Sequence, residues 1–176
     1  LIENKTANFP LKEKVNFIIK NKIQARDSYY ISKLVGEKIV ELSGYDYINL
    51  RPHNVYGPRM GYSHVIPELI NKFKNKEKKI KIYSPTQKRA LCYVDDAINQ
   101  MIKLAFNKKA NNNAFNIGNN KEEIKMIDLA SKIRGLLDIK KKLIRGSNTP
   151  GSPTRRVPDM HKTNNLTKNL KFTNLD

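Results

Sequence analysis

The sequence has few residues that form disulfides or bind metals, with one cysteine and three histidines, and tryptophan is absent. A single cysteine, Cys92, excludes an intrachain disulfide and a cysteine-rich metal site. Because the residues around Cys92 are apolar, we expect a buried, inert thiol in a reducing cytoplasm. His53, His64 and His161 are dispersed without metal-ligand spacing, so no metal is predicted.

Long hydrophobic runs are also missing. No stretch reaches the roughly 18 to 20 consecutive apolar residues that a membrane-spanning helix needs. The first residues lack the charged and hydrophobic regions of a secretory signal. The sequence therefore predicts a cytoplasmic protein without a membrane partner.

Glycine is scarce, and none of the eight glycines belongs to a G-x-G-x-x-G or G-x-x-G-x-x-G string. Such a string is the fingerprint of dinucleotide binding, because its backbone approaches the pyrophosphate closely. The chain also begins at Leu1 and not at a methionine. We interpret it as a fragment.

Basic residues are abundant, and the formal net charge is +18. A charge of this size keeps a nucleic-acid-binding module open as an alternative, since basic proteins bind phosphate backbones electrostatically. However, lysine is spread along nearly every segment and does not form one stripe. Short runs such as 76–79 and 140–142 are typical of solvated loops and helix ends, so nucleic acid is not the expected partner.

Tyr29 and Lys33 stand four residues apart, a spacing that places both side chains on one face of a helix. A tyrosine phenol titrates near pH 10, so ionising one at neutral pH requires about 4 kcal/mol of anion stabilisation. A lysine charge about 5 Å away supplies on the order of 3 kcal/mol, and an oxidised nicotinamide ring would add a second cation. By spacing alone, Tyr29 fits equally well as a core aromatic and Lys33 as an ion-pair partner of Glu37.

Several segments, in the same order, resemble one family. The first four are Ser-Tyr-x-x-Ser-Lys-x-x-Gly-Glu at 28–37, Arg-Pro-His-Asn-Val-Tyr-Gly-Pro-Arg at 51–59, the segment 64–73 that begins His-Val-Ile-Pro-Glu, and Arg-x-x-x-Tyr-Val-Asp-Asp at 89–96. Asn-Ile-Gly-Asn at 116–119 and Arg-x-Pro-Asp at 156–159 follow. These strings are similar to extended short-chain dehydrogenases/reductases of the NAD-dependent epimerase/dehydratase family, which modify nucleotide sugars. The resemblance covers almost the whole chain but only the carboxyl-terminal half of the family.

The resemblance implies roles for particular residues. The implied catalytic residues are Tyr29 and Lys33. The implied contacts to NAD come from Tyr29, Lys33, Pro52, His53 and Val55. The implied contacts to a nucleoside-diphosphate sugar come from Asn54, His64, Val65, Arg89 and Arg156.

Several of these positions have alternatives. Asn54 also fits an ordinary Asx turn, and Arg155 also fits the place given to Arg156. Relatives often have Asn where this chain has His64 and Asp where it has Ala90. The catalytic Ser or Thr of relatives would fall at or just before residue 1, so Thr6 is interpreted as a loop threonine. Asp95 and Asp96 are interpreted as the N-cap and first-turn acids of a helix and not as a catalytic pair.

The predicted fold is α/β, with the carboxyl-terminal part of a Rossmann-type doubly wound parallel sheet and a smaller α/β substrate-binding lobe. Residues 1–60 would end the Rossmann domain, and 61–176 would form mainly the lobe, with 80–100 and 114–119 partly returning to the sheet. The pattern predicts helices over 27–43, 126–137 and 162–170, with one more after 64 and one after 96. The helix over 126–137 would pack through one face formed by Ile127, Ala130, Ile133, Leu136 and Leu137. Strands are predicted over 45–51, 80–83 and 114–119.

The intact protein is therefore expected to be an NAD-dependent nucleotide-sugar epimerase or dehydratase that acts through a 4-keto sugar and forms a homodimer. A 4,6-dehydratase or decarboxylase of the same family and a non-catalytic relative stay open. Residues 1–176 alone are expected to bind no NAD, and to expose the face that the missing half would cover.

Overall fold

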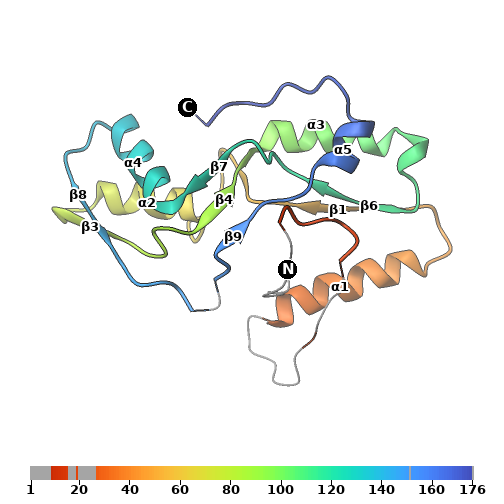
Figure 1. Cartoon of the computed structure of the whole chain (residues 1–176), viewed down its shortest axis with the longest axis horizontal. Helices are drawn as coiled ribbons and strands as arrows, with labels where there is room; N and C mark the ends of the chain where they lie inside the picture. Colours follow the sequence, from red (N-terminus) through yellow and green to blue (C-terminus); the bar gives the residue numbers. More distant parts are fainter. Residues whose placement is uncertain (1–8, 16–18, 20–26, 151, 176) are drawn as a thin grey trace.

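The computed structural model describes residues 9–15, 19, 27–150 and 152–175, and the order of elements is α/β (Figure 1). Thr6 lies outside the described residues. Strand pairs are mostly parallel, which the sequence predicts for the carboxyl-terminal part of a doubly wound sheet. No helix in the described part of the chain has the length and apolar character needed to cross a membrane.

One half of the molecule is built around two parallel strands, β1 (Ile48–Pro52) and β6 (Asn113–Ile117), which pair Ile48 with Asn113 and Pro52 with Ile117. Helix α1 (Asp27–Glu41) lies below them in Figure 1, and α3 (Val94–Ala105) and α5 (His161–Leu166) lie above. Phe115, Ile117 and Leu104 are fully buried and form the core between β6 and α3. The 3-10 turn Lys108–Ala110 leads from α3 into β6.

The other half packs α2 (Val65–Lys74) and α4 (Met126–Leu136) against the parallel pair β3 (Lys79–Ile82) and β8 (Lys142–Arg145). Its core contains Phe73, Ile80 and Leu129, which are buried almost completely. The alternating burial of β3 is typical of a strand with one face in a core.

Short strands connect the two halves. Strand β4 (Lys88–Ala90) pairs with β7 (Glu123–Lys125) on one side and β9 (Arg155–Arg156) on the other, and β2 (Val55–Tyr56) pairs with β5 (Cys92–Tyr93). This arrangement brings the loop after β1 close to β4 and β9.

Several boundaries differ from the sequence prediction. Strand β1 begins at Ile48 and not at residue 45, because Gly44 has a left-handed φ of 79° and Tyr45 is exposed. Helix α5 ends at Leu166, four residues before the predicted end. Leu136 was predicted on the packed face of α4 but is 71% exposed, and Leu129 takes the buried position instead.

The interpretation of Asp95 and Asp96 needs a partial correction. The residue before α3 is Tyr93, which makes no side-chain cap, and both acids lie in the first turn. Asp96 is buried, and its carboxylate accepts hydrogen bonds from Thr173, from the backbone N at 2.7 Å and from Oγ1 at 3.3 Å. Asp96 therefore fixes the carboxyl-terminal tail, while Asp95 remains exposed.

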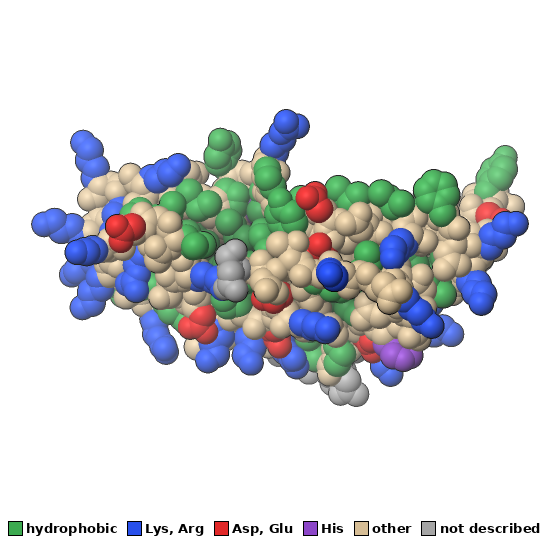
Figure 2. Space-filling model, turned by 90° about the horizontal axis from the view of Figure 1, so that it is seen from above, with side chains coloured by type: hydrophobic (Ala, Val, Ile, Leu, Met, Phe, Trp, Pro, Cys, Tyr) green, Lys and Arg blue, Asp and Glu red, His purple; other side chains and the backbone are tan. Residues whose placement is uncertain are grey.

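Helix α1 has no buried residue. The nonpolar side chains of Val35 and Ile39 on α1, and of Leu42 directly after it, are exposed, with Ile39 64% and Leu42 85% exposed. On the face seen in Figure 2, Lys and Arg side chains are spread around the outline, with hydrophobic side chains between them. The charge thus forms no single stripe on that face, which does not favour the nucleic-acid alternative.

Candidate active site

Tyr29 and Lys33 lie one turn apart on α1, as their spacing predicts. The Lys33 ammonium nitrogen is 5.4 Å from the centroid of the Tyr29 ring. Tyr29 is 68% exposed, so its phenol is open to a ligand. The catalytic role of this pair stays a prediction.

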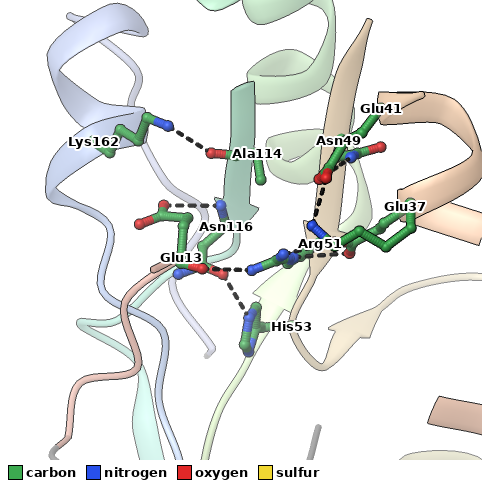
Figure 3. Close-up of polar contacts among 10 residues, drawn as sticks. Glu13, Glu37, Glu41, Asn49, Arg51, His53, Ala114, Asn116 and Lys162 are labelled. Carbon is green, nitrogen blue, oxygen red and sulfur yellow. Dashed lines mark hydrogen bonds and ion pairs between the residues drawn. The ribbon is translucent and has the colours of Figure 1, made fainter. Parts of the chain in front are cut away.

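The orientation of α1 depends on β1 (Figure 3). Arg51 donates to both carboxylate oxygens of Glu37, from Nε at 2.8 Å and from Nη2 at 2.6 Å. A third bond runs from Arg51 Nη1 to the backbone oxygen of Glu13 at 2.8 Å. Asn49 adds a bond from Nδ2 to Glu41 at 3.3 Å. Bidentate pairs of this kind fix geometry as well as adding energy, so the strand positions the helix that carries Tyr29.

His53 is buried at the end of β1. Its backbone N donates to the oxygen of Ile117 at 2.8 Å, and its Nε2 lies 3.1 Å from Oδ1 of Asn116. The amide nitrogen of Asn116 donates to the backbone oxygens of Leu11 and Asp159, so Oδ1 is the acceptor and His53 carries its proton on Nε2. Burial lowers the pKa of His53 to about 4, which keeps the ring neutral.

Asn54 has a left-handed backbone with a φ of 44°. Its Nδ2 donates to the backbone oxygen of Ala90 at 2.9 Å, and its own backbone oxygen accepts from Cys92 N at 3.3 Å. The amide therefore joins the loop after β1 to the β4–β5 segment, a contact that differs from an Asx turn. Its contact with a substrate stays a prediction.

Arg89 and Arg156 occupy paired positions in the neighbouring parallel strands β4 and β9. Paired residues in a sheet point to the same face, so the two arginines lie on one face of the sheet. Arg155 faces elsewhere and donates to both carboxylate oxygens of Glu123, at 2.6 and 2.9 Å. The hydrogen bond from Arg155 lowers the pKa of Glu123. Arg155, the sequence's alternative to Arg156 as a nucleotide contact, is thus engaged in an ion pair with Glu123.

A cavity of about 640 Å³ brings most of the predicted residues together. From the first half it is lined by Tyr29 of α1 and by the segment from the end of β1 to the start of β2, which contributes Pro52, His53, Asn54 and Val55. From the second half it is lined by His64 and Val65 at the start of α2, and by Arg89 and Arg156. Lys33 is the one predicted site residue outside this lining, and its ammonium lies next to the ring of Tyr29, which is part of the lining.

Other lining residues are not predicted from the sequence. Lys72 and Lys81 place their ammonium groups 5.5 Å from the ring centroid of Tyr83, a partly exposed lining residue. Gln87 and Ser152 also line the cavity and contact Arg89. The sequence does contain a signal for Gln87. It stands two residues before Arg89, and alternate residues of an extended segment lie on the same face. Ser152 has no such signal.

Comparison with known proteins gives a consistent result. The sequence profile of the NAD dependent epimerase/dehydratase family matches residues 7–118, more than half of the chain. UDP-glucuronic acid decarboxylase 3 of Arabidopsis thaliana is 30% identical over 149 residues, which cover 81% of this chain and 42% of that protein.

Two solved structures have the same fold over nearly the whole chain. A UDP-N-acetylglucosamine 4-epimerase from Methanobrevibacter ruminantium, in complex with UDP-N-acetylmuramic acid, superposes with a TM-score of 0.75 and 24% identity, covering 94% of this chain and 53% of that one. The UDP-glucuronic acid 4-epimerase of Bacillus cereus, in complex with UDP-glucuronic acid and NAD, gives 0.72 and 23%, covering 93% and 53%. The chain thus spans about half the length of the proteins it matches.

Proposed function

This chain belongs to the NAD dependent epimerase/dehydratase family, and from that premise we propose that it supplies the substrate-binding and proton-transferring half of an NAD-dependent nucleotide-sugar epimerase or dehydratase. One observation carries the proposal. A single cavity is lined by the exposed phenol of Tyr29 and by two arginines, Arg89 and Arg156, at paired positions in adjacent strands. A proton acceptor and an anion-binding pair in one cavity suit a sugar attached to a diphosphate.

The charge of the cavity supports an anionic ligand. Among its described lining residues, four are basic, namely Lys72, Lys81, Arg89 and Arg156. The acidic lining residue is Glu68, which already forms an ion pair with Lys72. The similar Arabidopsis protein is a UDP-glucuronic acid decarboxylase, and the two similar solved structures contain UDP-N-acetylmuramic acid and UDP-glucuronic acid. We therefore propose a UDP sugar as the substrate.

The residues present fit one end of NAD. Pro52, His53 and Val55 line the cavity beside Tyr29, at the carboxyl end of β1, where parallel sheets bind their ligands. The backbone there and the Lys33 ammonium would hold the nicotinamide and its ribose. The pyrophosphate would depend on a glycine-rich turn outside these 176 residues, since none of the eight glycines forms one.

Tyr29, as a phenolate, would take the proton of the sugar hydroxyl at C4, and Lys33 would stabilise the negative charge of the phenolate before that transfer. NAD, when bound, supplies hydride acceptance and return, which no side chain of this chain can provide. Arg89 and Arg156 would bind the diphosphate, so that binding energy far from C4 orients the reacting carbon. In an epimerase, C4 of the resulting 4-keto sugar would regain a hydride on its opposite face while Tyr29 returns the proton to the C4 oxygen. In a dehydratase or decarboxylase, the keto sugar would first lose water or carbon dioxide.

We also propose that the intact protein works in the cytoplasm as a homodimer. The outward nonpolar side chains of Val35 and Ile39 support a covered surface on α1. Sedimentation of the natural full-length protein should give twice the monomer mass, and a monomer at micromolar concentration would contradict this part of the proposal.

The function is tested with the natural full-length protein, NAD and UDP-glucose or UDP-glucuronic acid, with products followed by nuclear magnetic resonance. Replacing Tyr29 with phenylalanine should lower kcat by about a thousandfold, because the proton acceptor is lost. The matched control is Tyr30→Phe, which removes the same hydroxyl one residue away, outside the cavity lining, and should retain activity. Full turnover by the Tyr29→Phe protein would rule out the mechanism.

A further inference from the structure

Arg89 is held by two neutral side chains. Its Nη2 donates to Oε1 of Gln87 at 2.7 Å and to Oγ of Ser152 at 2.9 Å. The Ser152 hydroxyl in turn donates to Oε1 of Gln87 at 2.8 Å, and Gln87 Nε2 donates to the Ser152 backbone oxygen at 3.3 Å. Gln87 is buried, so this closed set of hydrogen bonds fixes one nitrogen of the guanidinium.

The chemistry of these acceptors matters for charge. Neither a glutamine oxygen nor a serine hydroxyl is ionised, so both orient Arg89 without neutralising it. Arg155 shows the contrast, because Glu123 contacts it through both carboxylate oxygens and compensates its charge. In the same sheet, Arg155 is thus paired with a carboxylate, whereas the contacts of Arg89 with Gln87 and Ser152 are made to uncharged groups.

Ser152 also lies on the segment that carries Arg156. That segment runs alongside residues 84–89, with Thr149 N donating to Ser84 Oγ at 2.9 Å and Lys88 N donating to the Thr154 oxygen at 3.0 Å. The pairing of Arg89 with Arg156 follows from the same alignment. Contacts at Ser152 thus bear on the relative placement of both arginines.

We propose that Gln87 and Ser152 are positioning residues, which hold the Arg89 guanidinium beside Arg156 in the geometry that receives the diphosphate of the nucleotide. The proposal rests on the proposed function, since it assigns the arginine pair to a diphosphate. It adds two residues that touch no reacting atom and act only through Arg89.

The test compares UDP with uridine, because the ratio of the two affinities isolates the diphosphate. Titration calorimetry on the natural full-length protein should show that UDP binds more tightly than uridine. Ser152→Ala should weaken UDP binding about 5- to 10-fold and change uridine binding less than twofold. The variant loses the hydrogen bond that orients Arg89, and only UDP carries the diphosphate that Arg89 would bind. Ser152→Thr, which keeps the hydroxyl, should restore most of the UDP affinity.

Two further variants separate positioning from folding. Ser147→Ala makes the same chemical change on the same segment, where the backbone oxygen and not the hydroxyl contacts Ser84, and should leave both affinities unchanged. Gln87→Glu keeps an acceptor for Arg89 but neutralises its charge. It should lower UDP affinity at least as much as Ser152→Ala while the protein stays folded.

The outcomes distinguish the two proposals. If the native protein binds UDP no better than uridine, the diphosphate site itself is wrong and the proposed function loses its support. If Arg89→Ala removes the advantage of UDP but Ser152→Ala and Gln87→Glu retain it, only the positioning roles are wrong. Equal weakening of UDP and uridine by Ser152→Ala would likewise assign Ser152 a purely structural role.

Discussion

The Arg51 guanidinium and the Glu37 carboxylate form a bidentate pair in which both side chains are largely shielded, with 15% and 19% of their surfaces exposed. This pair joins strand β1 to helix α1, a helix without buried residues of its own. The position of Tyr29 therefore depends on a polar contact more than on core packing.

Replacing Glu37 with glutamine should lower the free energy of unfolding by about 2 kcal/mol, because Arg51 loses a charged acceptor in a partly buried place. Urea unfolding followed by circular dichroism measures the change. The matched control is Lys38→Gln, which breaks the exposed pair between Lys38 and Glu41 on the same helix and should cost less than about 0.5 kcal/mol. Equal losses in the two proteins would show that the bidentate pair has no special role.

His53 should make stability depend on pH. Burial lowers its pKa from 6.5 to about 4, helped by the nearby Arg156 and Arg51 charges and opposed by the Asn116 hydrogen bond. Between about pH 6.5 and about pH 4 the unfolded chain binds the extra proton, so stability should fall as pH falls through this window, by at most about 3 kcal/mol. Urea midpoints at pH 7.0, 5.5 and 4.5 measure the slope.

The His53→Gln protein should have a smaller decrease over the same window, since glutamine keeps a donor for Asn116 and does not titrate. A native protein with the same slope as this variant would show that other groups cause the acid sensitivity.

Cys92 should resist alkylation while the chain is folded. Its thiol is buried, and burial together with the neighbouring Asp96 charge raises its pKa to about 12. Because the thiolate is the reactive form, labelling by iodoacetamide at pH 8 should be at least about a hundredfold slower in buffer than in 8 M urea. Mass spectrometry over time gives both rates, and similar rates would mean that β5 opens readily.

The two neighbouring acids of α3 should differ in their effect on stability. Asp96→Ala removes the acceptor of Thr173 and should cost about 1 to 2 kcal/mol, whereas Asp95→Ala loses only its interaction with the helix dipole, about 0.5 kcal/mol. Trypsin cleavage after Lys171 should also accelerate in the Asp96→Ala protein. Identical behaviour of the two variants would contradict the anchoring role of Asp96.

Much of the fold could be predicted from local patterns. The period of apolar residues located α1 and α4 to within two residues, and β6 was found because a strand pattern follows an Asn-rich turn. The function of Asp96 could not be predicted, because its partner is Thr173, 77 residues away. Leu136 failed for a related reason: helical spacing predicts a face, but the tertiary structure decides how far that face stays covered.

The sequence also predicted most of the residues that line the candidate site. Family-like strings identified residues of five separate segments, and the structure places nearly all of them around one cavity, while their roles stay predictions. Gln87 and Ser152 were missed because their contact joins residues 65 positions apart. A sequence motif contains the residue that contacts a ligand. The neighbours that orient this residue can come from any segment that packs against it in the folded chain.

The exposed nonpolar side chains on α1, and that of Leu42 directly after it, lead to an expectation for mutational scans. Val35, Ile39 and Leu42 belong to neither of the two cores, so a mutational scan scored by folding of this chain should tolerate polar replacements there. A scan scored by the nucleotide-sugar conversion proposed for the full-length protein should reject the same replacements. The difference between the two maps would outline, residue by residue, the footprint of whatever covers the helix that carries Tyr29.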